Sequence, residues 1–159
     1  MKRKIFLGVL AIFLAGFAFA SLFSQHGDYY KKYESLKYGF IPYYSTIDKK
    51  CSDKDRQTAQ NVVELAGEIM TDVSGSVHTQ AGELAAYSVK KADVRRVEAK
   101  INLITADFTF GNGYVWVEYT KRDFDENEKL LEEKECLAYW KLKKQDGVWN
   151  VIKIKEVAR

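Results

Sequence analysis

The chain has 159 residues, of which 47% are hydrophobic and 30% charged, proportions typical of a folded globular protein and not of a disordered one. Its formal net charge is +3, from 25 lysines and arginines against 22 acidic residues, and three of those cations are the consecutive Lys2, Arg3 and Lys4. Basic and acidic residues are equal in number over the remainder, so we expect no nucleic-acid partner, because phosphate binding needs clustered cations.

The first segment, 1–23, is predicted to enter the membrane. Ile5–Phe23 contains no charged residue, and as a helix it would be about 28 Å long, close to the roughly 30 Å hydrocarbon core of a bilayer. Lys2, Arg3 and Lys4 directly precede the apolar run, and the next charged residue after it is Asp28. The positive-inside rule therefore predicts a cell-membrane protein with its N-terminus in the cytoplasm and its C-terminal domain on the extracytoplasmic side.

Two fates of this segment are open. The small residues around Ala20 fit a signal-peptidase site, and cleavage after Ala20 would release the domain as a secreted protein. The apolar run continues to Phe23, however, and tyrosines follow where an interfacial aromatic belt would lie. We prefer a single-pass signal-anchor, a transmembrane helix through residues 5–23.

Residues 24–50 are predicted to form a juxtamembrane stalk. This segment contains six tyrosines, and a short helix is expected from about Asp28 to Tyr38, ended by Gly39 and Pro42. The tyrosines either pack on the membrane surface and on the domain, or bind a protein partner, since tyrosine is favoured at interfaces.

The domain proper is expected over residues 51–159, and it begins with a helix. Ser52 can cap this helix together with Asp55 three residues later. Apolar residues then recur at three- and four-residue steps, and Gly75 provides a stop signal. The stripe consists of Ala59, Val62, Val63, Ala66, Ile69, Met70 and Val73. A second, shorter helix is expected from about Gln80 to Lys90.

From Val94 onward the apolar period changes to two residues, which predicts β-strands. Gly111-Asn112-Gly113 and Asp146-Gly147 are predicted hairpin turns, and a change of phase in the last strand predicts a bulge near Val151. The apolar positions of the first three strands are Ile104, Ala106, Phe108, Phe110, Val115, Val117, Tyr119, Cys136, Ala138, Trp140 and Leu142.

The predicted fold class is α+β, with amphipathic helices packed on a curved antiparallel four-stranded meander. A sheet with one apolar face must be covered, and the Ser52–Ser74 helix is the available cover.

This order of elements and the closing pattern W-x-L-x-x-x-D-G-x-W-x-V, from Trp140 to Val151, resemble the NTF2-like (SnoaL-like) superfamily of cystatin-like folds. Over roughly Ser52–Arg159 the resemblance implies a cone-shaped pocket between helices and sheet, which some members use for catalysis with Asp/His pairs. An anchored extracytoplasmic domain of this kind also looks like VirB8-type components of conjugation and secretion machines. That likeness implies a protein partner or a homo-oligomer.

No catalytic set can be assembled from the sequence, so enzymatic activity is not the expectation. His26 falls in the stalk and His78 in a connection. If the cone binds a small ligand, the candidate lining residues are Trp116, Glu118 and Trp140. The preferred interpretation is that all three tryptophans, Trp116, Trp140 and Trp149, fill the core between sheet and helix, and the alternative is that one or two of them line such a pocket.

Neither a metal nor a cofactor is expected. Asp123, Asp125 and Asn127 are spaced like the start of an EF-hand calcium loop, but its required glycine and final glutamate are replaced by Glu128 and Lys134. A solvated hairpin loop is therefore preferred over a calcium site.

Cys51 and Cys136 are the only cysteines. An extracytoplasmic location permits a disulfide between them, which would join the helix to the sheet. Two buried free thiols are the alternative.

The expected function is that of a membrane-tethered extracytoplasmic binding or assembly module without catalytic activity. A ligand-binding or enzymatic SnoaL-like domain that uses the cone pocket, and a secreted domain, are the alternatives.

Overall fold

The structure is a computed structural model, and it describes residues 46–47, 49–75, 82–88 and 91–159. Lys49–Arg159 form one compact unit. The predicted leader and nearly all of the predicted stalk lie outside the described residues. Within the described part, no helix has the length and apolarity needed to cross a bilayer.

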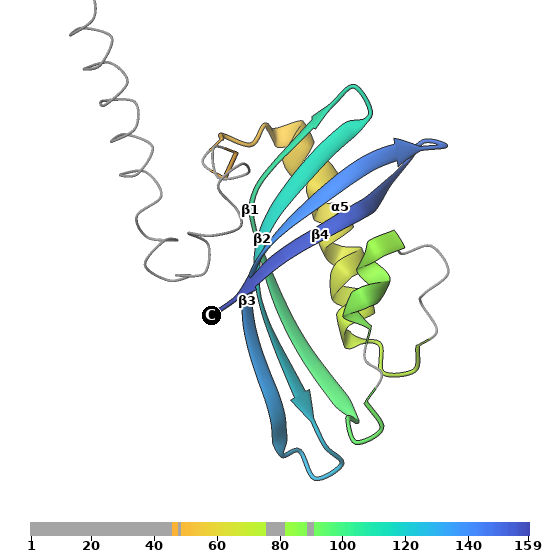
Figure 1. The fold of residues 1–159 in the computed structure, drawn as a ribbon, viewed down its shortest axis with the longest axis vertical. Helices are drawn as coiled ribbons and strands as arrows, with labels where there is room; N and C mark the ends of the chain where they lie inside the picture. The colour runs from red at the N-terminus through yellow and green to blue at the C-terminus, as the bar shows by residue number, and fades with distance from the viewer. Residues whose placement is uncertain (1–45, 48, 76–81, 89–90) are drawn as a thin grey trace, which may run out of the picture. The chain divides into compact units, whose positions relative to one another are not determined.

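The compact unit confirms the predicted α+β class. It contains helix α5 (Asp53–Thr71), the 3-10 helix η2 (Gly82–Tyr87) and the strands β1 (Arg96–Thr109), β2 (Asn112–Phe124), β3 (Leu130–Gln145) and β4 (Val148–Ala158). The strands form one antiparallel meander in the order β1-β2-β3-β4. Figure 1 shows α5 and η2 on the same face of the long, curved sheet.

Helix α5 begins as predicted, because the Ser52 hydroxyl accepts a hydrogen bond from the Asp55 backbone N–H at 3.1 Å and caps the first turn. Its buried side chains are Ala59, Val62, Val63, Ala66, Ile69 and Met70. The helix ends at Thr71, earlier than the predicted Ser74. There the Asp72 carboxylate accepts from the backbone N–H of Ser74 at 2.8 Å and of Gly75 at 3.2 Å, which replaces a further helical turn.

Each of the three strand pairings contains a register shift, and two of these shifts fall at positions that bear on the predicted pattern. The β1–β2 register skips Ile104, and the β3–β4 register skips Ile152, which confirms the predicted bulge near Val151. An extra residue at a bulge reverses the side of the sheet to which the following side chains point. Contrary to the prediction from the sequence, Ile104 therefore does not alternate regularly with Ala106 and Phe108.

The first hairpin turn differs from the prediction by one step along the chain. Thr109 pairs with Asn112, so the turn residues are Phe110 and Gly111, with φ of 49° and 76°. Gly113 lies inside β2, where a Cβ would fall 2.4 Å from the Phe108 ring. The predicted Asp146-Gly147 turn is confirmed, with φ of 51° and 85°.

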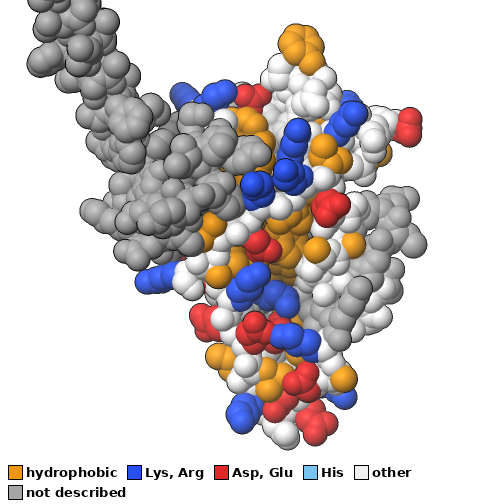
Figure 2. All heavy atoms as spheres, viewed as in Figure 1, with side chains coloured by type: hydrophobic (Ala, Val, Ile, Leu, Met, Phe, Trp, Pro, Cys, Tyr) orange, Lys and Arg blue, Asp and Glu red, His pale blue; other side chains and the backbone are white. Residues whose placement is uncertain are grey.

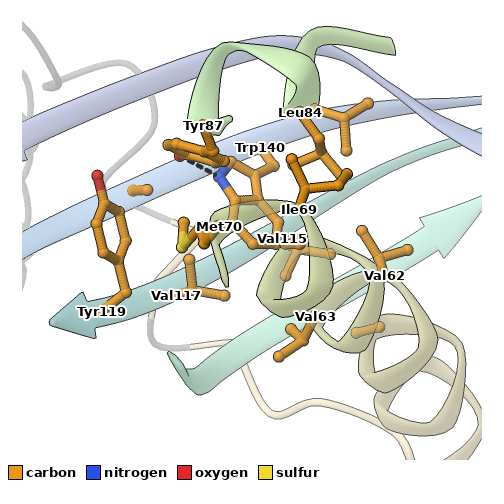
Figure 3. Close-up of a cluster of buried hydrophobic side chains, with 14 of the residues drawn as sticks. Val62, Val63, Ile69, Met70, Leu84, Tyr87, Val115, Val117, Tyr119 and Trp140 are labelled. Atoms are coloured by element: carbon orange, nitrogen blue, oxygen red, sulfur yellow. Dashed lines mark hydrogen bonds between the residues drawn. The ribbon is translucent and has the colours of Figure 1, made fainter. Parts of the chain in front are cut away.

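The core fills the space between α5, η2 and the sheet (Figure 3). Met70 and Trp140 are 0% exposed and Tyr119 is 1% exposed. Leu84 and Tyr87 of η2 close the cluster, so the second predicted helix has the expected covering role although it is a 3-10 helix.

Candidate functional site

The three residues predicted to line one pocket lie on two faces of the sheet. Trp140 belongs to the core under α5 and η2. Trp116 and Glu118 alternate with the core residues Val115 and Val117 of β2, so their side chains lie on the opposite face, called the outer face below. The structure therefore does not bring Trp116 and Glu118 together with Trp140.

Trp116 belongs to a short aromatic row on the outer face. Its ring centroid lies 5.1 Å from that of Tyr139 in an edge-on arrangement, and Tyr139 lies 6.0 Å from Tyr114. Trp116 is fully buried, but not between sheet and helix as predicted. The prediction that all three tryptophans fill that space is therefore wrong for Trp116 and right for Trp140.

Trp140 is held in a buried aromatic cluster (Figure 3). Its indole N–H donates to the Tyr87 hydroxyl at 2.9 Å, and the Tyr87 ring lies 5.6 Å from Tyr119. Tyr119 in turn donates to the Glu156 carboxylate. Burial, reinforced by nearby Glu156, raises the pKa of both Tyr87 and Tyr119 far above its ordinary value, so neither phenol acts as a base near neutral pH.

Both cysteines are free thiols in the structure, so the bond that the sequence allows is not formed in it. Cys51 precedes α5 and is half-buried, whereas Cys136 is buried beside Tyr119. Burial is the main cause that raises the pKa of the Cys136 thiol, which makes it a poor nucleophile.

The acidic stretch folds as the turn between β2 and β3. The Asp125 carboxylate accepts backbone hydrogen bonds from Asn127 at 2.8 Å and Lys129 at 2.9 Å, which uses it to close the turn. Among the residues that the structure describes, no group of three histidine, cysteine, aspartate or glutamate side chains is placed to hold a metal ion. His26 and His78 lie outside the described residues.

One buried carboxylate was missed by the sequence analysis. Asp123 is 3% exposed, and its oxygens lie 2.9 Å from Lys121 Nζ and 3.8 Å from Lys91 Nζ. Lys91 also hydrogen-bonds Glu132 across to β3. The alternate spacing of Lys121 and Asp123 on one strand face was the available signal. This cluster joins the start of the sheet to the β2–β3 turn and is an ion-pair network.

The outer face also has an open recess of about 500 Å³. It is lined by Glu98, Ala99, Lys100, Thr120 and Arg122 of β1 and β2. Arg122 pairs with Glu133 of β3 at 3.1 Å. Three of the five lining residues are charged, which suits a polar surface of a partner better than an apolar small molecule.

The two turns Phe110–Gly111 and Asp146–Gly147 lie at the same end of the sheet (Figure 1), and the Lys144 backbone N–H donates to Gly111 C=O at 2.8 Å. We call residues 107–114 and 141–153 the hairpin end. It carries four lysines and two aspartates, whereas the opposite hairpin, residues 121–135, carries seven acidic and four basic residues. Figure 2 shows this difference between the two ends, with an apolar side chain projecting from the top.

Phe110 is the least expected residue at the hairpin end. Its side chain is 99% exposed, although its backbone has the positive φ that Asn, Asp or Gly usually supply in two-residue hairpins. The left-handed conformation costs an L-residue roughly 1–2 kcal/mol. The matching turn uses Asp146 at the same position, so the fold itself does not require phenylalanine there.

The comparisons with known proteins add no family to this description. No protein-family model matches the chain, and no curated protein matches it.

Proposed function

We propose that this chain is a membrane-tethered extracytoplasmic binding or assembly module without catalytic activity. In this proposal residues 5–23 anchor the chain, and the domain is NTF2-like and works in an envelope complex of the VirB8 type, with a protein partner or with further copies of itself.

The filled interior is the observation that carries the proposal. In the NTF2-like cone a ligand or substrate would lie between the helices and the sheet, but here Trp140, Tyr119 and Met70 occupy that space and are essentially unexposed. The phenols inside are held neutral and the thiol of Cys136 has a raised pKa. Binding is therefore assigned to the outside of the domain.

The charged recess on the outer face is the assigned docking surface. Glu98, Lys100 and Arg122 present charges of both signs around it, an arrangement that favours a complementary polar surface and fixes the orientation of a partner. Interfaces of transient assemblies commonly have such charged rims.

The tether is tested with an alkaline phosphatase reporter fused after Arg159, which is active only outside the cytoplasm. We expect activity, and mass spectrometry of the mature chain should find residues 1–20 retained. A mature N-terminus at Ser21 would instead establish the secreted alternative. Reporter activity confined to the cytosol would overturn the proposal.

The partner is tested by placing a photo-cross-linking amino acid at Lys100, in the recess, and at Gln60, on the exposed side of α5. In intact membranes the position-100 protein should give a discrete adduct and the position-60 protein should not. Absence of an adduct at position 100, with the full chain monomeric in detergent, would refute the binding role.

A further inference from the structure

We infer that the hairpin end is a membrane-contact surface, which docks on anionic lipid headgroups with Phe110 entering the interfacial layer. The inference rests on the proposed function only in that the tether keeps the domain beside a bilayer.

The first reason is the strain at Phe110. An exposed phenylalanine with φ of 49° adds nothing to the core, and the equivalent turn shows the residue that relieves the strain, Asp146. A strained backbone conformation at a residue that does not stabilise the fold points to a functional role for that residue. Phenylalanine is among the side chains that peripheral proteins insert at the headgroup boundary of a bilayer, and Val148, 60% exposed at the second turn, adds apolar surface to the hairpin end.

The second reason is charge. Lys143 and Lys144 are exposed beside the turns, and the Lys144–Gly111 hydrogen bond holds both hairpins together as one surface. Cations around a projecting apolar side chain match a bilayer, where anionic headgroups overlie apolar chains. The acidic β2–β3 hairpin at the other end of the sheet would be repelled by the same headgroups. Charge therefore favours the hairpin end as the part of the domain that contacts the membrane.

A protein groove could also take a phenylalanine. We favour the membrane because the apolar residues here are two turn tips with lysines around them, whereas a protein-binding hot spot is a packed apolar cluster within a polar rim.

The test uses the full chain in lipid nanodiscs whose acyl chains carry bromine, with and without phosphatidylglycerol. Phe110→Trp places a fluorophore at the hairpin end, and Leu130→Trp, 45% exposed on the acidic hairpin, is the matched control. The signal of the parent chain, from Trp116, Trp140 and Trp149, is subtracted. We expect bromine quenching of Trp at position 110 in phosphatidylglycerol discs and none at position 130.

Charge reversal gives the second arm. Lys143→Glu with Lys144→Glu in the Phe110→Trp chain should abolish the quenching, because each lysine near an anionic surface contributes roughly a fivefold factor to the contact equilibrium. High salt should weaken the quenching in the same way.

The Phe110→Asn variant is the control for folding of the hairpin end. Asparagine suits the turn, so the variant should unfold at a higher urea concentration than the parent.

The outcomes separate the two proposals. Failure of the chain to enter nanodiscs contradicts the tether. Entry without quenching at position 110 overturns the membrane contact alone, and a protein adduct from a cross-linker at position 110 would reassign the surface to a protein. Equal quenching in neutral discs would also overturn it, since headgroup charge is then irrelevant.

Discussion

Tyr87 and Tyr114 place buried phenols on opposite faces of the sheet in different hydrogen-bonding states. Tyr87 accepts the indole N–H of Trp140, whereas the Tyr114 hydroxyl is buried without a hydrogen-bond partner among the described residues. Burial, with Asp107 nearby, raises the pKa of Tyr114 to about 12. Removing one partner of a buried hydrogen bond lowers the free energy of unfolding, because the other partner is left buried and unsatisfied. Removing a polar atom that has no partner carries no such cost.

Tyr87→Phe should therefore lower the free energy of unfolding by about 1–3 kcal/mol, because the buried Trp140 N–H is left without an acceptor. Tyr114→Phe, the same chemical change, should leave it unchanged or raise it. Urea denaturation followed by tryptophan fluorescence measures both, since all three tryptophans lie in the sheet. Equal losses in the two variants would contradict this assignment of the hydrogen bond.

Two glycines differ in whether the surrounding packing leaves room for a side chain. Gly67 lies in α5, and a Cβ there would meet the Ile101 side chain at an ordinary 4.0 Å. Gly113 lies in β2, and a Cβ there would overlap the Phe108 ring, which packs at 4.7 Å on Trp149.

Gly67→Ala should stabilise the protein by up to about 1 kcal/mol, because alanine is the better helix former. Gly113→Ala should destabilise it by about 1–3 kcal/mol, because Phe108 must leave its place against Trp149. Thermal unfolding followed by circular dichroism tests both. If Gly113→Ala caused no loss of stability, Phe108 would have room to move and the described packing of its ring on Trp149 would be wrong.

At the scale of the whole molecule, titration links the core to stability. Tyr87 and Tyr119 have pKa values raised by burial and by Glu156. An acid whose folded pKa is raised contributes its full stability below its unfolded pKa, about 10 for tyrosine, and that contribution is lost as the pH rises through the folded value.

We therefore expect the protein to be destabilised above about pH 10, by about 1.4 kcal/mol per pH unit for each of these tyrosines. Their phenolate absorbance should appear only together with loss of the β-sheet circular dichroism signal. In Tyr119→Phe the slope of stability against pH should decrease. Tyrosines that ionise fully before the sheet unfolds would show that the aromatic cluster is open to solvent.

The sequence by itself determined the elements of the domain. The cap at Ser52, the helical stripe of α5, the two-residue period of the strands, the Asp146–Gly147 turn and the bulge near Val151 are all local patterns, and the structure has each of them. Local patterns suffice because each depends on residues within a few positions of one another.

Only the tertiary structure decided what those elements bring together. Alternation within β2 sets Trp116 opposite Val115, but relating two strands requires their register. The pairing of Val115 with Trp140 shows that Trp140 lies on the other face of the sheet from Trp116. The β1–β2 register, in which Thr109 pairs with Asn112, places the first turn at Phe110 and Gly111. The filled cone and the exposed Phe110 therefore emerged from packing and pairing across the chain, which no local pattern encodes.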